Sequence, residues 1–268
     1  MKAVFFDLDD TLLRDDLTIS DFSVRVFKRL RENGYFIVPS SGRACLSMKP
    51  FVDRLSCVNV FISCNGAEIW NEYSATPLFQ ELFPVETAVS IAEFAEKHDC
   101  YAQVYEGNRF FYSHRCIYAE RYAASSRLEG CYVGKLSDYI HKPRNKILMI
   151  DEESKITLMY KEACSLFAGI ASVTCSKPWY LEFNPLSATK GIALRKVAEF
   201  LKVDLNDTIA IGDSLNDLSM LQAAGIGVAV DNGRDELKNC SDFICGGNNE
   251  DGPAHFLNNY CLHGEVVP

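Results

Sequence analysis

Residues 2–11 read KAVFFDLDDT, and this stretch decides the fold. The apolar run predicts a buried strand, which leads straight into Asp7, Asp9 and Asp10. Side chains alternate along a strand, so Asp7 and Asp9 can act together only if the chain turns sharply after Leu8. Such a turn lies at the carboxyl end of a strand, where open α/β sheets bind ligands. The cluster therefore predicts either a solvated turn or an acidic pocket that holds a cation.

A second apolar strand, predicted over 208–212, also ends in an aspartate. Asp213 follows its last glycine, and Asp217 comes four residues later, near the start of a helix predicted over 216–224. Capping of that helix would explain Asp217, but it does not explain Asp213, which directly follows the strand. Two strands that each end in aspartate predict one acidic pocket at a shared edge of the sheet.

Two shorter signals lie between these strands. The predicted strand around 36–40 ends in Ser41-Gly42-Arg43, where a glycine lets backbone N–H groups approach an anion and a hydroxyl can donate to it. Lys190 begins a predicted helix, a place that the helix dipole makes unfavourable for a cation. Each signal is weak alone, because turns and solvated lysines are common.

Together the four segments resemble, in their order, the four motifs of the haloacid dehalogenase-like hydrolases. More narrowly, the chain is similar to the Cof-type sugar-phosphatase branch, which carries a large cap between the second and third motifs. The motifs read DLDDT at 7–11, SGR at 41–43, KG at 190–191 and GDSLND at 212–217, with supporting strings at 63–67, 182–185 and 228–233. Three positions depart from the family pattern: Asp10 and Ser187 stand where glycine is usual, and Ser41 replaces the commoner threonine.

The resemblance implies an α/β fold: a Rossmann-like, three-layer, parallel-sheet core with an inserted α+β cap. We expect the core in residues 1–83 plus 186–268 and the cap in 84–185, with hinges near Pro84 and Pro185. Alternating strands and helices agree with this division. In the core we expect a helix from Ser20 or Asp21 to Gly34 and a third strand over 57–63. In the cap we expect helices over 86–97, 117–128 and 154–167, and strands over 101–105, 109–112, 146–151, 171–175 and 179–183.

The resemblance also implies phosphoryl transfer through a phosphorylated aspartate. Asp7 would be the nucleophile, Asp9 the general acid and base, and Lys190 the cation that neutralises Asp7 and the phosphoryl group. Mg²⁺ would be held by Asp7, the backbone carbonyl of Asp9, Asp213 and, directly or indirectly, Asp217. Phosphate would be bound by Leu8, Thr11, Ser41, Gly42, Lys190 and Asn216. For Arg43, a substrate contact and a surface ion pair are equally good interpretations. Cap aromatics (Tyr101, Tyr105, Phe110, Phe111, Tyr112, Trp179 and Tyr180) include candidates for closing over a substrate, although most fit a packed core better.

Composition limits the classes of partner. The 268 residues are 48% hydrophobic, enough for a sizeable core, and the net charge of −9 without a basic cluster argues against nucleic acid. No apolar run is long enough for a membrane span, and no export signal is apparent. The eleven cysteines are scattered, which favours reduced thiols in the cytoplasm. We expect a monomer or small homo-oligomer that acts on a small phosphorylated metabolite.

Three other functions stay open at this point. A phosphomutase would use the same phosphorylated aspartate and return the phosphoryl group to another hydroxyl. A phospho-aspartate receiver would share the acids, hydroxyl and lysine, but it would lack a base such as Asp9 and would be one compact domain of about 120 residues. A catalytically silent binding protein is disfavoured, because every catalytic residue type is present.

Overall fold

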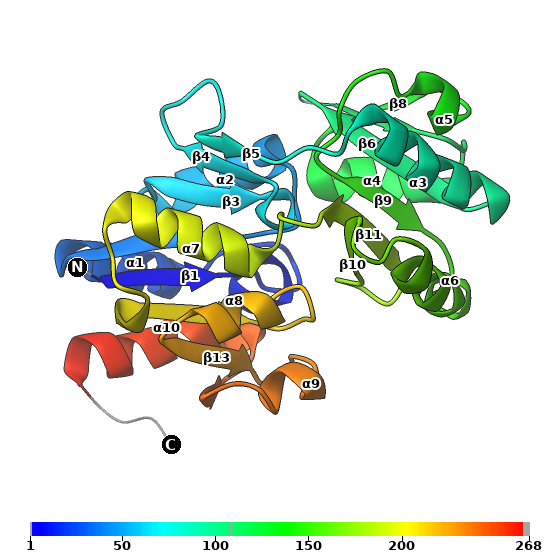
Figure 1. Ribbon diagram of the computed structural model, residues 1–268. Helices are drawn as coiled ribbons and strands as arrows, with labels where there is room; N and C mark the ends of the chain where they lie inside the picture. Colours follow the sequence, from blue (N-terminus) through cyan, green and yellow to red (C-terminus); the bar gives the residue numbers. More distant parts are fainter. Residues whose placement is uncertain (1, 108, 265–268) are drawn as a thin grey trace.

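A computed structural model describes residues 2–107 and 109–264, and it folds into two units with separate sheets (Figure 1). The first unit contains a parallel sheet in the order β14-β13-β12-β1-β2. Its central strand, β1, lies between β2 and β12, so segments from the two ends of the sequence are direct neighbours. The strands are β1 (Lys2–Phe6), β2 (Tyr35–Pro39), β12 (Thr208–Gly212), β13 (Ile226–Val230) and β14 (Phe243–Cys245).

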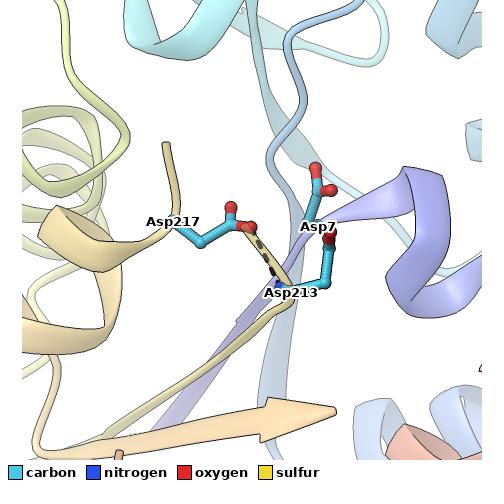
Figure 2. Close-up of side chains that lie close together, drawn as sticks. All are labelled: Asp7, Asp213 and Asp217. Carbon is cyan, nitrogen blue, oxygen red and sulfur yellow. Dashed lines mark hydrogen bonds between the residues drawn. The ribbon is translucent and has the colours of Figure 1, made fainter. Parts of the chain in front are cut away.

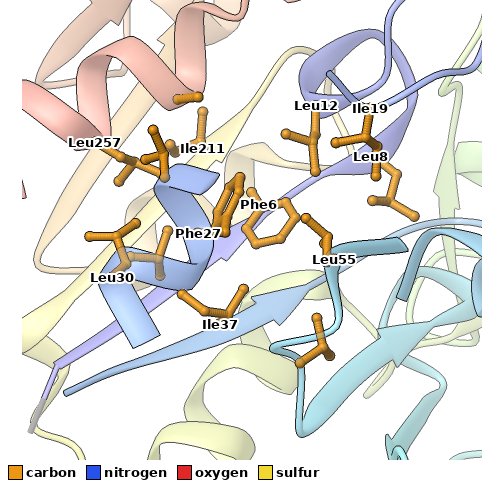
Figure 3. Close-up of a cluster of buried hydrophobic side chains, with 14 of the residues drawn as sticks. Phe6, Leu8, Leu12, Ile19, Phe27, Leu30, Ile37, Leu55, Ile211 and Leu257 are labelled. Carbon is orange, nitrogen blue, oxygen red and sulfur yellow. The ribbon is translucent and has the colours of Figure 1, made fainter. Parts of the chain in front are cut away.

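Helices cover both faces of this sheet and make three layers. Phe6 points to one face, where its ring lies 4.6 Å from that of Phe27 (Figure 3). Phe5 points to the opposite face and packs in a second cluster with Leu194 and Val197. The predicted Rossmann-like core is therefore confirmed. Its helices are α1 (Asp21–Glu32), α2 (Cys45–Leu55) and α10 (Gly252–Leu257) on the Phe6 face, and α7 (Lys190–Leu201), α8 (Leu218–Ala223) and α9 (Asp235–Lys238) on the Phe5 face.

Local sequence explains the ends of α1. The side chain of Ser20 accepts a hydrogen bond from the N–H of Ser23 and caps the first turn. The helix ends before Gly34, whose φ of +85° is easily reached only by glycine.

The third predicted strand differs from its expected place. β3 (Val60–Ser63) meets β2 only through one parallel bridge, between Ser40 and Ile62. Beyond β3 the chain turns back at Asn65 and Gly66, which have φ of 56° and 103°. This reversal makes β3 the first strand of a small antiparallel sheet, with β4 (Glu68–Asn71) and β5 (Phe79–Gln80), rather than a full member of the parallel sheet.

The inserted unit is an α+β domain, as predicted. Its sheet has the order β10-β11-β9-β6-β7-β8 and is antiparallel except for the pair β7 and β8. Strand β8 was not predicted; it pairs with β7 where Gly130 lies against the ring of Phe110. The strands are β6 (Tyr101–Glu106), β7 (Arg109–Tyr112), β8 (Glu129–Tyr132), β9 (Ile147–Ile150), β10 (Ala171–Thr174) and β11 (Tyr180–Pro185). The helices are α3 (Val85–Lys97), α4 (Ile117–Ser126), α5 (Leu136–Tyr139) and α6 (Glu153–Leu166).

The two faces of the cap sheet have different neighbours. One face packs under α3, α5 and α6 around Phe94, Phe167 and Phe183. The other carries α4, and its cluster includes Ala44 and Ala188 of the first unit. The second face therefore lies against the core, near the carboxyl ends of the core strands.

In the part of the chain that the structure describes, no helix is long and apolar enough to cross a membrane. Each of the eleven cysteines is a free thiol. The predicted boundaries of the cap, with pivots at Pro84 and Pro185, stay a prediction.

Candidate active site

The turn predicted after Leu8 exists and brings the first acids to the edge of the sheet. Asp7 follows β1, and its N–H donates to the carbonyl of Ile211 on β12, 2.9 Å away. The chain then enters the short helical turn η1 (Leu8–Leu12), inside which Asp9 is extended and Asp10 is left-handed, with φ of 57°. β1 and β12 thus end side by side, as required for one shared pocket.

Three carboxylates meet at this edge (Figure 2). Oxygens of Asp7, Asp213 and Asp217 lie within 4.8 Å of one another. Asp217 is held in place by the backbone N–H groups of Asp213 and Ser214, each 3.1 Å from its Oδ2. A Cβ on Gly212 would come within 2.5 Å of the Asp217 side chain, so only glycine allows this approach.

Lys190 is the fully buried cation of this cluster. Its Nζ lies 2.7 Å from Asp7 Oδ1 and 2.5 Å from Asp217 Oδ1. Burial lowers the pKa of Lys190, but the two carboxylates outweigh that effect and hold the pKa above its ordinary value. A cation at the start of α7 is therefore explained by these acids and not by the helix.

The acids exceed the cations in the pocket. Burial, followed by the charges of Asp217 and Asp9, raises the pKa of Asp7 to about 7 even though Lys190 opposes the shift. Burial and the neighbouring acids Asp217 and Asp7 raise the pKa of Asp213 well above its usual range. Among the described residues of the pocket, six carboxylates (Asp7, Asp9, Asp10, Glu182, Asp213 and Asp217) meet four cations (Arg43, Lys146, Lys177 and Lys190), a formal excess of two negative charges. A divalent cation fits this excess, and clustered carboxylate oxygens are the ligands that Mg²⁺ prefers.

Asp9 lines the same cavity, and its carboxylate binds Arg43. The guanidinium donates from Nε to Asp9 Oδ2 at 2.8 Å and from Nη2 to Oδ1 at 2.7 Å. Burial raises the pKa of Asp9, but the bonds and charge of Arg43 outweigh it, and the pKa falls below its ordinary value. The predicted ion pair of Arg43 is present, but its side chains are only 11% and 23% exposed, so it lies in the pocket and not on the open surface. A substrate contact for Arg43 stays a prediction. Arg43 also donates to the carbonyl of Ser125 in α4, which links Asp9 to the cap.

The predicted phosphate-binding residues lie around the same edge, and several of their polar groups already bond to neighbours within the protein. The Thr11 hydroxyl donates to Asp213 Oδ1 at 2.8 Å, so it already has a partner. The Ser41 hydroxyl accepts from the N–H of Arg43 at 3.1 Å. Asn216 donates from Nδ2 to Asn65 Oδ1 at 3.1 Å. A small cavity lies over this edge, between the core and the cap. Its lining includes Asp7, Asp9, Ser41, Gly42, Arg43, Asp213 and Asn216, but not Leu8, Thr11, Lys190 or Asp217.

The cap closes this cavity to about 60 Å³. Lys177 Nζ lies 3.6 Å from Asp10 Oδ2, and Ser214 donates to the carbonyl of Ser176 at 3.3 Å. An open cleft of about 860 Å³ lies next to the cavity and shares Asp10, Asp213, Ser214, Ser176 and Lys177 with its lining. Small-molecule sites usually measure about 300–1,000 Å³, so the enclosed cavity is smaller than a typical site and the adjoining cleft falls within the range.

Sequence reasoning missed the residues with which the cap meets the cavity. Lys146 and Glu182 have no periodic or motif signal of their own, although Glu182 lies in one of the strings that support the resemblance. Of the suspected aromatics, Tyr101, Tyr105 and Phe110 are buried in the cap, and Trp179 lines the open cleft. The cap residues that line the closed cavity are Tyr122, Lys146, Leu148, Ser176, Lys177 and Glu182.

Comparisons with known proteins agree with this geometry. The sequence model of the family described as haloacid dehalogenase-like hydrolase matches residues 4–257. The chain is 31% identical over 266 residues to a putative phosphatase of Haemophilus influenzae, covering 96% of this chain and 97% of the relative. It is 27% identical over 266 residues to a 5-amino-6-(5-phospho-D-ribitylamino)uracil phosphatase of Bacillus subtilis, covering 96% of each.

A solved structure has the same arrangement. It is a haloacid dehalogenase-like hydrolase from Bacteroides thetaiotaomicron, 28% identical, with a TM-score of 0.84 over 96% of this chain and 98% of the other. The match of the family model over nearly the whole chain agrees with the four motifs at the strand ends and the inserted cap. The chain belongs to the haloacid dehalogenase-like hydrolases, in their capped, Cof-type branch.

Proposed function

We propose that this protein is a Mg²⁺-dependent phosphatase that hydrolyses small phosphorylated metabolites through a phosphorylated Asp7. The observation that supports it most is the group of Asp7, Asp213, Asp217 and Lys190 at the ends of β1 and β12, under a closed cap. Its family membership and its phosphatase relatives assign the protein to the phosphoric monoester hydrolases acting on phosphorylated small molecules. The metal, the intermediate and the residue roles are the proposal.

In the first step, an oxygen of Asp7 attacks the phosphorus atom. The ester P–O bond breaks, and Asp9 gives a proton to the departing oxygen. In the second step, a water attacks the phosphorus of the aspartyl phosphate, Asp9 takes the proton of that water, and the Asp7–phosphorus bond breaks. Lys190 stays beside Asp7 and neutralises charge in both steps. Since little covalent chemistry is required of the protein, positioning and charge supply most of the catalysis.

Mg²⁺ would be held by the side chains of Asp7, Asp213 and Asp217 and by the backbone carbonyl of Asp9. When bound, it offsets the repulsion between Asp7 and the phosphate.

Arg43 favours the ionised form of Asp9, but the first step of the reaction needs the protonated form. In the closed structure its guanidinium keeps the pKa of Asp9 low, whereas the first step needs a proton on Asp9. A phosphate dianion beside the pair adds negative charge and competes for Arg43. We propose that substrate binding raises the pKa of Asp9 in this way and so prepares the general acid.

The cap side of the cavity favours a polar leaving group. Lys146, Glu182 and Tyr122 line it, and this polar lining supports sugar or polyol phosphates as the substrate class. The phosphoribityl compound named for the Bacillus subtilis relative belongs to this class.

We also propose that residues 84–185 move as the cap. The free thiols fit a reducing cytoplasm.

The test is a panel of phosphorylated metabolites assayed for free phosphate with Mg²⁺, with the organic product identified in each case. We expect many turnovers for at least one sugar phosphate and loss of activity in EDTA. Product that retains phosphate at another hydroxyl would identify a phosphomutase. Release that stops at one equivalent would identify a receiver, and unchanged release in EDTA would refute the metal assignment.

A further inference from the structure

The side chain of Asn216 is held from one end only. Its Nδ2 donates to Asn65 Oδ1, and its Oδ1 is buried without a partner among the residues that the structure describes. Asn216 is 8% exposed and lines the catalytic cavity beside Asp7 and Ser41. Since an amide nitrogen carries two hydrogens, the bond to Asn65 leaves one N–H for a ligand in the cavity. The direction of that N–H therefore depends on Asn65.

Asn65 has only one orientation that satisfies its neighbours. Its Nδ2 lies 2.7 Å from Glu182 Oε2, and an ionised carboxylate can only accept. Its Nδ2 also lies 3.2 Å from Asn184 Oδ1. Asn184 directs its own Nδ2 to the carbonyls of Cys64 and Asn145, at 2.8 and 3.1 Å, so its Oδ1 must face Asn65. Two acceptors thus fix the Asn65 amide, and its Oδ1 is left to accept from Asn216.

The carboxylate that fixes Asn65 belongs to a buried ion pair of the cap. Lys146 Nζ lies 2.5 Å from Glu182 Oε1, and the two side chains are 2% and 3% exposed. The same Nζ donates at 2.8 Å to the carbonyl of Gly42, in the phosphate-binding segment of the core. As the ion-pair partner of Lys146, the Glu182 carboxylate accepts hydrogen bonds and donates none. Gly42 also leaves room for this chain of contacts, because a Cβ there would lie 2.9 Å from Asn65 Oδ1.

We propose that Asn65 is a positioning residue that aims the second N–H of Asn216 at a phosphoryl oxygen of the substrate, and that the cap ion pair Lys146–Glu182 sets the orientation of Asn65. This relay consists of Lys146 and Glu182 in the cap, then Asn65 and Asn216 in the core, and Asn216 is the residue that touches the phosphoryl group. It rests on the proposed function, because the ligand is the phosphoryl group of the substrate.

The test is a double-mutant cycle on Asn65 and Asn216, with inorganic phosphate as the ligand. Affinity is measured by calorimetry in Mg²⁺, so the result does not depend on turnover. A hydrogen bond to a charged group is typically worth about tenfold or more in affinity. We expect Asn216→Ala to weaken phosphate binding about 10- to 100-fold and Asn65→Ala about 3- to 30-fold. In the double variant, Asn65→Ala should add less than about twofold.

A purely structural role of Asn65 would give a different result. Loss of Asn65 would then lower the melting temperature and phosphate affinity equally with or without Asn216. If the affinity losses of the two single variants multiply in the double variant, the proposal is overturned.

Glu182→Gln tests the contribution of the cap. Glu68→Gln is its matched control, because Glu68 is also buried but contacts Ser63, Trp70, Gln80 and Asn145 instead. We expect weaker phosphate binding for Glu182→Gln alone. Equal losses for both glutamates would remove the cap from the relay.

The relay and the phosphatase function can fail separately. If the parent releases no phosphate from any substrate, the proposed function fails whatever the cycle shows. If the parent turns over normally but phosphate affinity stays within twofold in Asn65→Ala, the relay fails alone.

Discussion

Asp7 and Asp9 lie two positions apart and experience opposite electrostatic environments. Burial and neighbouring carboxylates raise the pKa of Asp7 to about 7. At Asp9, Arg43 outweighs burial and lowers the pKa. The pair therefore differs in proton affinity because of its neighbours, as in other enzymes in which adjacent carboxylates take different roles.

Replacing Asp7 tests the nucleophile. We expect Asp7→Asn to lower turnover by at least about 10³-fold, because an amide oxygen is a poor nucleophile. The fold should persist, since the substitution removes a buried charge from a crowded cluster. Phosphate release and thermal unfolding are measured on the same preparation. Turnover close to that of the parent would contradict the role of Asp7.

Replacing Arg43 tests the control of Asp9. We expect Arg43→Ala to raise the pKa of the Asp9 carboxyl, observable by NMR titration. Turnover should fall about 10- to 100-fold, because the second step needs Asp9 as an unprotonated base and the substrate phosphate loses its contact with Arg43. Arg54→Ala is the control, because Arg54 forms an ion pair with Asp21 that is exposed on both sides and should matter little. An unchanged Asp9 titration would show that Arg43 does not set its charge.

At the scale of elements, the strand ends were the most predictable feature. The runs before Asp7 and Asp213 indicate buried strands, and because β1 and β12 are parallel neighbours, the acids had to meet. The reversal at Asn65 and Gly66 was not predictable, because it depends on backbone angles that few sequence patterns demand. The contacts of Lys146 and Glu182 were not predicted for another reason. They depend on how the two domains pack together, which local periodicity does not encode.

Gly212 is the last residue of β12 and contacts Asp217, so its substitution tests whether the position of Asp217 matters for metal binding. A Cβ on Gly212 would come 2.5 Å from Asp217, so Gly212→Ala should displace that carboxylate. We expect Mg²⁺ affinity, measured by calorimetry, to fall about tenfold or more. Gly246→Ala is the matched control, because its nearest contact would be an ordinary 3.4 Å. Equal Mg²⁺ affinity in both variants would place Asp217 outside the metal site.

For the whole molecule, the raised pKa of Asp7 links stability to pH. The folded protein holds this proton up to about pH 7, whereas the unfolded chain releases it near the ordinary value of 3.8. Stability from this group is therefore greatest at low pH and falls as the pH rises through about 4 to 7. Relative to Asp7→Asn, we expect the melting temperature of the metal-free parent to fall across this range, and Mg²⁺ to raise that of the parent more at pH 8 than at pH 5.

The Asp7→Asn variant serves as the control for this pH dependence. It should lose part of the slope between pH 4 and 7, because the group that titrates is gone. A slope identical to that of the parent would assign the effect to other groups.

The closed cavity predicts a movement of the whole cap. The enclosed cavity of about 60 Å³ is smaller than a phosphorylated sugar, and we predict that the cap opens to admit one. We expect small-angle scattering to show a larger radius of gyration for the free protein than for the protein with Mg²⁺ and a phosphate mimic. Identical curves in both states would count against opening.

The central place of β1 between β2 and β12 has a consequence for synthesis on the ribosome. The cap strands, from β6 to β11, are contiguous in sequence, so all of them are synthesised before β12. β1 has to wait for β12, which at about 5–20 residues per second arrives about 10–40 s later. Until then the nascent chain holds every cap strand beside an open edge of β1, and its catalytic pocket does not yet exist. The enzyme is thus synthesised with its lid before its active site, and that exposed edge is where chaperones have most reason to act.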